Sequence, residues 1–148
     1  MRTITLIIIH CSATPEGKDY TVQDIDRWHK ARGWKGIGYH YVIYRDGSIH
    51  KGRPEEQVGA HCQNHNKYSI GICYIGGTRP SQPPLKGGEV TYKAADTHTP
   101  EQKAAMRALL VELKQSYPRA LIMGHNVFAN KSCPCFDAVK EYADLQPR

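Results

Sequence analysis

The sequence predicts an α/β fold, in which a parallel or mixed β-sheet is covered by helices. Residues 3–9 form a nearly continuous apolar run rich in β-branched side chains, and residues 69–75 form a second such run. Strands that are apolar throughout are typical of sheets buried on both faces. Residues 99–117 carry the strongest helix signals. A chain of 148 residues can bury a core as one domain, which we expect to span residues 1–148.

The composition indicates a globular protein and excludes several classes. Hydrophobic residues make up 40% of the chain and charged residues 23%. No apolar run is long enough to cross a bilayer, so we expect no membrane insertion. The net charge of +6 favours an anionic partner. The basic residues are scattered and form no nucleic-acid-binding motif, so we expect no nucleic-acid partner.

The first residues are interpreted as a strand and not as a signal peptide. After the short apolar block comes His10-Cys11, where a signal peptide would carry small residues at a cleavage site. We therefore expect a protein that is cytoplasmic as synthesised. In this compartment, an odd count of five cysteines favours free thiols or a metal ligand over a disulfide framework.

The first strand and the first helix each carry a histidine of interest. The first strand ends at His10, and open α/β sheets bind ligands beyond the carboxyl ends of their strands. His10 is therefore a candidate metal ligand. Thr21 is the expected N-cap of a helix over 22–32, and Asp24 makes an imperfect capping box with it. His29 lies beside the apolar face of this helix, so we expect it to be a hydrogen-bonded structural histidine.

The next segment predicts a hairpin. Two short strands, 41–44 and 49–53, flank Asp46-Gly47, a dipeptide typical of hairpin turns. Tyr39 precedes them and follows two glycines, which allow close backbone approach. A tyrosine hydroxyl near a metal can donate to a developing oxyanion. From the residues alone, a half-buried structural tyrosine is the simpler interpretation.

The middle of the chain is predicted to be mostly loop. His61 and Asn66 lie in a polar stretch before the strand at 69–75 and are candidate substrate-binding residues. His61 is equally compatible with plain loop surface. Residues 78–98 are rich in proline and glycine, which predicts a long loop with a short strand near 90–92.

The second helix is predicted to begin at Thr99 and to end near Tyr117. Thr99 is a good N-cap, Pro100 suits the first helical position, and Gln102 completes a capping box. Its buried stripe consists of Met106, Leu109, Leu110 and Leu113. A short strand over 120–123 follows it. A final helix is expected after Pro134, with Phe136, Val139 and Tyr142 on its apolar face.

The segment after that short strand concentrates metal-binding residue types. His125 ends the strand, as His10 ends the first one, and Cys133 follows eight residues later. Imidazole and thiolate are common zinc ligands. If the two strands are neighbours, both histidines lie at the same sheet edge. Three protein ligands leave a fourth position for water, as in catalytic zinc sites, and Lys131 would add a positive charge beside the metal.

Cys135 is an alternative ligand. Only Pro134 separates it from Cys133, which is too close for the usual Cys-x2-Cys arrangement. We therefore treat Cys135 as a bystander, although spacing alone leaves the choice open.

Seven motifs occur in a fixed order along most of the chain. They are HCSAT at 10–14, WHKARGW at 28–34, IGYHYVIYRDG at 37–47, GAH at 59–61, SIGIC at 69–73, TPEQ at 99–102 and GH-x7-CPxFD at 124–137. In this combination the sequence resembles the zinc-dependent N-acetylmuramoyl-L-alanine amidases of type 2, in particular the bacteriophage amidase lysozymes.

The resemblance implies a central mixed sheet flanked by about three helices, a fold shared with peptidoglycan recognition proteins. It implies one Zn²⁺ held by His10, His125 and Cys133. It also implies that Tyr39 and Lys131 assist catalysis. No Asp or Glu is obviously placed as the general base, so that role stays open between Tyr39 and a group behind the ligands. The implied reaction is hydrolysis, by metal-activated water, of the amide between N-acetylmuramic acid and L-alanine in peptidoglycan.

The resemblance also sets the expected partners. The substrate would be peptidoglycan or a muropeptide, reached after release or export by another route, and the protein would be a monomer. The alternative is a non-catalytic peptidoglycan-binding or regulatory module of the same fold. Such modules usually lack the cysteine ligand, so Cys133 favours an enzyme. The sequence departs from the phage enzymes in its longer 78–98 segment and in Cys135, which replaces a small polar residue.

Overall fold

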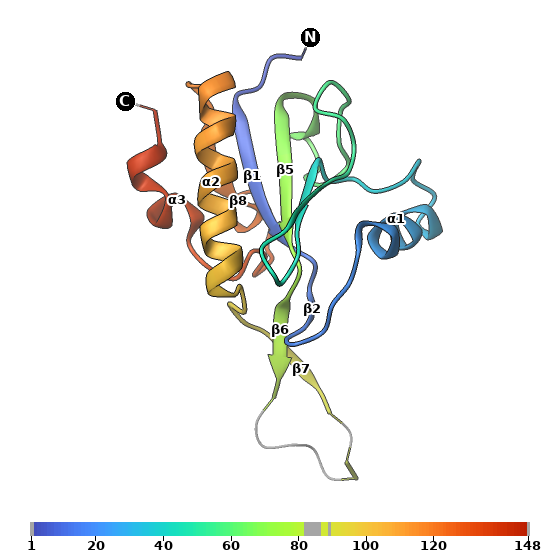
Figure 1. Cartoon of the computed structure of the whole chain (residues 1–148). Coiled ribbons are helices and arrows are strands. Elements are labelled where there is room, and N and C mark those ends of the chain that lie inside the picture. The colour runs from blue at the N-terminus through green and yellow to red at the C-terminus, as the bar shows by residue number, and fades with distance from the viewer. Residues whose placement is uncertain (1, 82–86, 89, 148) are drawn as a thin grey trace.

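A five-stranded mixed sheet forms the centre of the structure, a computed structural model that describes residues 2–81, 87–88 and 90–147. The strand order is β4-β3-β5-β1-β8, and every neighbouring pair is parallel except β3 with β4. The strands are β1 (Leu6–Cys11), β3 (Tyr41–Ile43), β4 (Ile49–Lys51), β5 (Ser69–Tyr74) and β8 (Leu121–Gly124). Helices cover both faces (Figure 1), so the predicted α/β fold with a central mixed sheet is confirmed.

Strand β1 lies in the middle of this sheet, between β5 and β8. All six residues of β1 and all six of β5 are buried, which explains their apolar sequences. The strand continues one residue beyond its predicted end at His10, because Cys11 also pairs with β5. His10 is therefore a buried residue inside the strand.

Helix α2 (Pro100–Ser116) covers one face of the sheet. Its predicted apolar stripe is buried in the main core with alternate residues of β1, including Ile7 and Ile9. The predicted capping box at Thr99 is present, with hydrogen bonds in both directions to Gln102. The Gln102 amide also donates to the carbonyl oxygens of Ile43 (3.2 Å) and Ile75 (3.0 Å), which fixes the helix to the sheet.

Helix α1 (Val22–Ala31) lies on the opposite side of the sheet (Figure 1). The predicted imperfect capping box is a full one: Thr21 and Asp24 each accept a hydrogen bond from the other's backbone N–H. Ile25 packs against Val42 in a second, smaller core. Val42 and Ile43 are adjacent in β3, so their side chains lie on opposite faces of the sheet. Val42 belongs to the small core with Ile25 of α1, and Ile43 belongs to the main core with α2.

A second, three-stranded sheet projects beyond the main one (Figure 1). Its order is β2-β6-β7, with β2 (Thr14–Pro15), β6 (Gly77–Pro80) and β7 (Tyr92–Ala94). The prediction of a long loop over 78–98 was therefore partly wrong, because both ends of that segment pair as a hairpin. The expected strand near 90–92 occurs slightly later, and residues 82–86 and 89 lie outside the described part of the chain.

The C-terminal helix is shorter than predicted. It begins at Ala138, because Asp137 is its N-cap, and α3 spans only Ala138–Glu141. Single turns of 3₁₀ helix form η1 (Asn66–Tyr68), η2 (His125–Val127) and η3 (Ala143–Leu145). Among the helices that the structure describes, none is long and apolar enough to cross a membrane.

Candidate metal centre

The three predicted metal ligands converge at the carboxyl end of the central strands. His10 lies in β1, and His125 directly follows β8; the parallel pairing of Ile9 with Gly124 places the two histidines side by side. Their ring centroids are 4.6 Å apart. Cys133 arrives from the loop after η2. One ligand atom from each of the three residues lies within 4.8 Å of the other two.

The donor set fits zinc. Two imidazoles and one thiolate are typical zinc ligands, and bonds of about 2.0–2.3 Å put tetrahedral ligand atoms roughly 3.5 Å apart. Because every pair of ligand atoms lies within 4.8 Å, each pair needs to approach by at most about 1.3 Å to reach that geometry. Burial lowers the pKa of His10 well below its usual range, and burial also lowers the pKa of His125. Both rings are therefore neutral near pH 7, the form that binds a metal.

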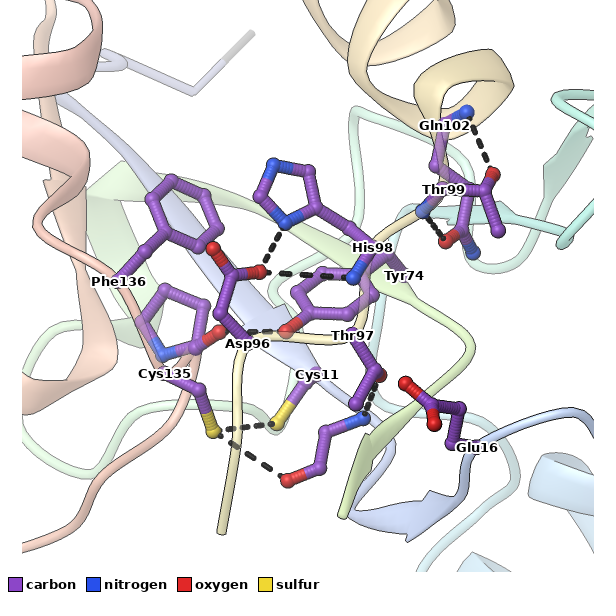
Figure 2. Close-up of polar contacts among 12 residues, drawn as sticks. Cys11, Glu16, Tyr74, Asp96, Thr97, His98, Thr99, Gln102, Cys135 and Phe136 are labelled. Atoms are coloured by element: carbon purple, nitrogen blue, oxygen red, sulfur yellow. Dashed lines mark hydrogen bonds and ion pairs between the residues drawn. The ribbon is translucent and has the colours of Figure 1, made fainter. Parts of the chain in front are cut away.

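Two hydrogen bonds position Cys133 as a candidate ligand. The N–H of Cys11 donates to Sγ of Cys133 over 3.1 Å, a contact that stabilises a thiolate ligand. The segment that carries Cys133 is held in place by the Tyr74 hydroxyl, which donates to the carbonyl oxygen of Pro134 over 2.6 Å. Phe136 stacks on His98 at a centroid distance of 4.6 Å (Figure 2).

His61 lies behind His10. His10 Nε2 and His61 Nδ1 share a hydrogen bond of 2.8 Å, and His61 Nε2 is 3.2 Å from the Ser69 hydroxyl. His61 is buried, and burial lowers its pKa to about 3. His61 also lines the cavity, but both of its ring nitrogens have protein partners. Because Nε2 of His10 is hydrogen-bonded to His61, Nδ1 is the His10 nitrogen that can bind a metal.

Glycine makes room for this histidine. A Cβ added to Gly71 in β5 would lie 2.6 Å from the His61 ring. Asn66 stabilises the loop that carries His61, because its side-chain oxygen accepts hydrogen bonds from the backbone N–H groups of His61 and Cys62, both at 2.9 Å. The side-chain oxygen of Asn66 is thus hydrogen-bonded within the protein. Asn66 also borders a surface groove of about 560 Å³, which is described below.

Tyr39 and Lys131 line the same cavity as the three candidate ligands. The Tyr39 ring is 5.1 Å from the His10 ring. Burial raises the pKa of Tyr39 well above its usual value, so the phenol keeps its proton near pH 7. Lys131 is exposed, and its charge contributes to the low pKa of both His10 and His125.

A wider groove adjoins this cavity. The cavity has a volume of about 230 Å³ and the groove about 560 Å³, and His125 and Lys131 border both. Arg32 and Trp34 also border both and were not predicted as site residues; the Arg32 guanidinium lies 5.5 Å from the centre of the Trp34 ring. The only sequence signal for them is the WHKARGW stretch at 28–34.

His29 and Cys135 lie outside the cluster of candidate metal ligands found among the described residues. Nδ1 of His29 accepts a hydrogen bond of 2.8 Å from the Gly38 N–H, as expected of a structural histidine. Cys135 does not belong to the metal-binding cluster found among the described residues. Its backbone adopts a left-handed conformation with φ of 74°, and its sulfur faces Cys11 and Gly77 (Figure 2).

Comparison with known proteins agrees with this geometry. The family model for N-acetylmuramoyl-L-alanine amidase matches residues 1–136. The endolysin of Klebsiella phage KP32 is 42% identical over 131 residues, which cover 88% of this chain and 80% of that protein. The endolysin of Escherichia phage T7 is 40% identical over the same shares of each chain.

A solved structure extends the match to three dimensions. The N-acetylmuramoyl-L-alanine amidase LysC of Clostridium intestinale superposes with a TM-score of 0.77 at 29% identity, covering 99% of this chain and 88% of that one. Sequence and fold therefore agree along nearly the whole chain. The protein belongs to the N-acetylmuramoyl-L-alanine amidase family and is an enzyme of that family.

Proposed function

We propose that this enzyme hydrolyses the amide between N-acetylmuramic acid and L-alanine in peptidoglycan, with one Zn²⁺ held by His10, His125 and Cys133. The observation that carries the proposal is the convergence of these three side chains on a cavity that opens into a groove. A set of three protein ligands is typical of catalytic zinc, whereas structural zinc usually has four. The endolysin relatives support the substrate class.

Zinc, when bound there, would polarise the scissile carbonyl and lower the pKa of a water molecule toward ~7. The chain's own groups supply the remaining stabilisation. The Lys131 ammonium stabilises negative charge as it develops on the carbonyl oxygen of the substrate. Tyr39, held as a neutral phenol, donates a hydrogen bond to the same oxygen or orients the attacking water.

His61 acts as a positioning residue in this proposal. Its hydrogen bond to His10 Nε2 fixes the ring orientation and the tautomer of the ligand, and Ser69 fixes His61 in turn. Such outer contacts strengthen metal binding in many zinc sites. This role replaces direct substrate contact for His61, and Asn66 supports it by holding the loop backbone.

The groove provides a binding surface for the wall fragment. Trp34 is an exposed aromatic residue next to Arg32, and together with Lys131 they combine apolar and cationic contacts suited to a muropeptide that carries carboxylates. We propose that residues 1–148 form one amidase domain that acts as a monomer on the cell wall.

The test is mass analysis of purified peptidoglycan after digestion. We expect new L-alanine amino termini with the zinc-loaded enzyme and none after treatment with a chelator, with activity restored by added Zn²⁺. New reducing sugar ends would instead identify a glycosidase and contradict the proposed bond. Digestion that survives complete zinc removal would contradict the metal requirement.

A further inference from the structure

Two thiols outside the proposed ligand set face each other beside the metal centre. Sγ of Cys11 lies 4.0 Å from Sγ of Cys135, although the residues are 124 positions apart (Figure 2). Cys11 ends β1 directly after His10, and Cys135 follows Cys133 by two residues. A disulfide needs a sulfur–sulfur distance of about 2.05 Å, so the two atoms must approach by about 2 Å.

The surroundings favour approach of these two sulfur atoms. Gly77 has no side chain, and a Cβ there would lie 2.5 Å from Cys11 Sγ, so the glycine leaves space for this thiol. Besides facing Cys11, the Cys135 thiol donates a weak hydrogen bond to the Gly77 carbonyl oxygen over 3.4 Å. Disulfide formation therefore gives up this weak hydrogen bond of Cys135.

Only one of the two thiols is open to a reagent. Cys135 is partly exposed and borders a surface pocket of about 590 Å³ with Ala94, Ala95 and Ser132. Cys11 is buried, with 5% of its surface exposed. A small oxidant in solution therefore meets Cys135 first, and Cys11 is placed to react second.

We propose that Cys11 and Cys135 are a redox-active pair that forms a disulfide with a low-molecular-weight disulfide as the oxidant. The Cys135 thiol gives up its proton and attacks the oxidant as a thiolate, forming a mixed disulfide and releasing a small thiolate that takes up the proton. Cys11 then attacks the Cys135 sulfur, forming the intramolecular disulfide and releasing the second small thiol. The protein loses two protons and two electrons, and the oxidant takes up both to become two thiols.

The disulfide joins the two chain segments that carry metal ligands. One end lies next to His10 and the other lies two residues from Cys133, so the bond restrains local opening of the Cys133 loop. Zinc at the proposed site protects Cys133, because a metal-bound thiolate is less available for exchange. Oxidation of the zinc-loaded protein therefore leaves the proposed ligand set intact.

The test treats the reduced, zinc-loaded protein with oxidised glutathione and maps the cysteines by mass spectrometry. We expect a mass decrease of about 2 Da and a single disulfide that joins Cys11 and Cys135. The Tm should rise by roughly 10 °C because the bond closes a very long loop, and a reductant should reverse the rise. Zinc transfer to a chelator should slow at least about threefold.

Cys135→Ser is the matched control, and it should show neither the disulfide nor the change in zinc transfer. Cys11→Ser should stop at the mixed disulfide on Cys135, because the second thiol is missing. A wild-type protein that keeps glutathione on Cys135, stays fully reduced, or forms a disulfide through Cys133 would overturn the proposal. Mapping needs no enzymatic activity, so its outcome is separate from that of the amidase assay.

Discussion

The Nε2 atom of His10 lies 2.8 Å from Nδ1 of His61, and the pair is buried behind the candidate metal centre. This hydrogen bond occupies Nε2 of His10, so Nδ1 is the nitrogen that can bind a metal together with His125 and Cys133. The Ser69 hydroxyl extends the chain of contacts to β5. His61 therefore matters for the proposed zinc site without being part of the ligand set.

Replacing His61 tests that relationship. We expect His61→Ala to lower zinc affinity about 10- to 100-fold, because His10 loses the partner that fixes its ring. Competition with a chromogenic chelator measures the affinity directly. Ser69→Ala should have a smaller effect, since it acts one contact further away. Wild-type zinc affinity in His61→Ala would contradict the positioning role.

Lys131 should affect turnover and not metal content. We expect Lys131→Ala to bind zinc as tightly as wild type and to lower kcat by about 100-fold, because a charge that stabilises the developing oxyanion is lost. Metal analysis and kinetics on a soluble muropeptide provide the two measurements. Lys131→Arg keeps the charge and should recover part of the rate, whereas near-normal turnover in Lys131→Ala would rule out the oxyanion role.

The two neighbouring cysteines should behave differently. Cys133→Ser removes a proposed ligand, so we expect loss of zinc and loss of wall digestion together. Cys135→Ser should keep both when the protein is reduced. Metal content after dialysis and release of L-alanine amino termini measure the two properties. If Cys135→Ser lost zinc while Cys133→Ser retained it, the ligand assignment would have to be reversed.

The glycine in β5 should be sensitive to a single added methyl group. We expect Gly71→Ala to lower the free energy of unfolding by about 1–3 kcal/mol, because its Cβ would lie 2.6 Å from the His61 ring. Urea denaturation measures this change. In a His61→Ala background the same substitution should cost less, since the ring is gone. Equal costs in both backgrounds would show that His61 is not the source of the clash.

The buried histidines predict an acid-sensitive fold. Burial lowers the pKa of His61 to about 3 and that of His29 to about 4, while the unfolded residues titrate near 6.5. The unfolded chain therefore binds more protons at low pH. Stability is present in full above pH 6.5 and falls as the pH drops toward 4, by about 1.4 kcal/mol per pH unit for each such histidine.

Urea unfolding of the metal-free protein between pH 4 and 8 checks this slope, so that zinc release does not contribute. A His61→Gln variant should show a slope smaller by one histidine. A stability that is constant between pH 6.5 and 4 would contradict the burial of neutral histidines.

The sequence by itself determined the elements whose signals are local. Apolar runs identified β1 and β5, and capping residues identified the starts of α1 and α2, because caps and strand burial depend on neighbouring residues. The similar endings of β1 and β8 also allowed His10 and His125 to be placed at one edge of the sheet. These features agree with the structure because β8 pairs parallel to β1, which puts the carboxyl ends of both strands at the same edge of the sheet.

The tertiary structure alone decided the contacts between distant segments. The His10–His61 hydrogen bond, the Cys11–Cys135 approach and the groove bordered by Arg32 and Lys131 each join residues more than 50 positions apart. The β6–β7 hairpin likewise depends on pairing across a long connection. The proline- and glycine-rich composition of this segment predicted a loop and gave no sign of the pairing. Such contacts arise from how the layers pack, and no local pattern in the sequence encodes that packing.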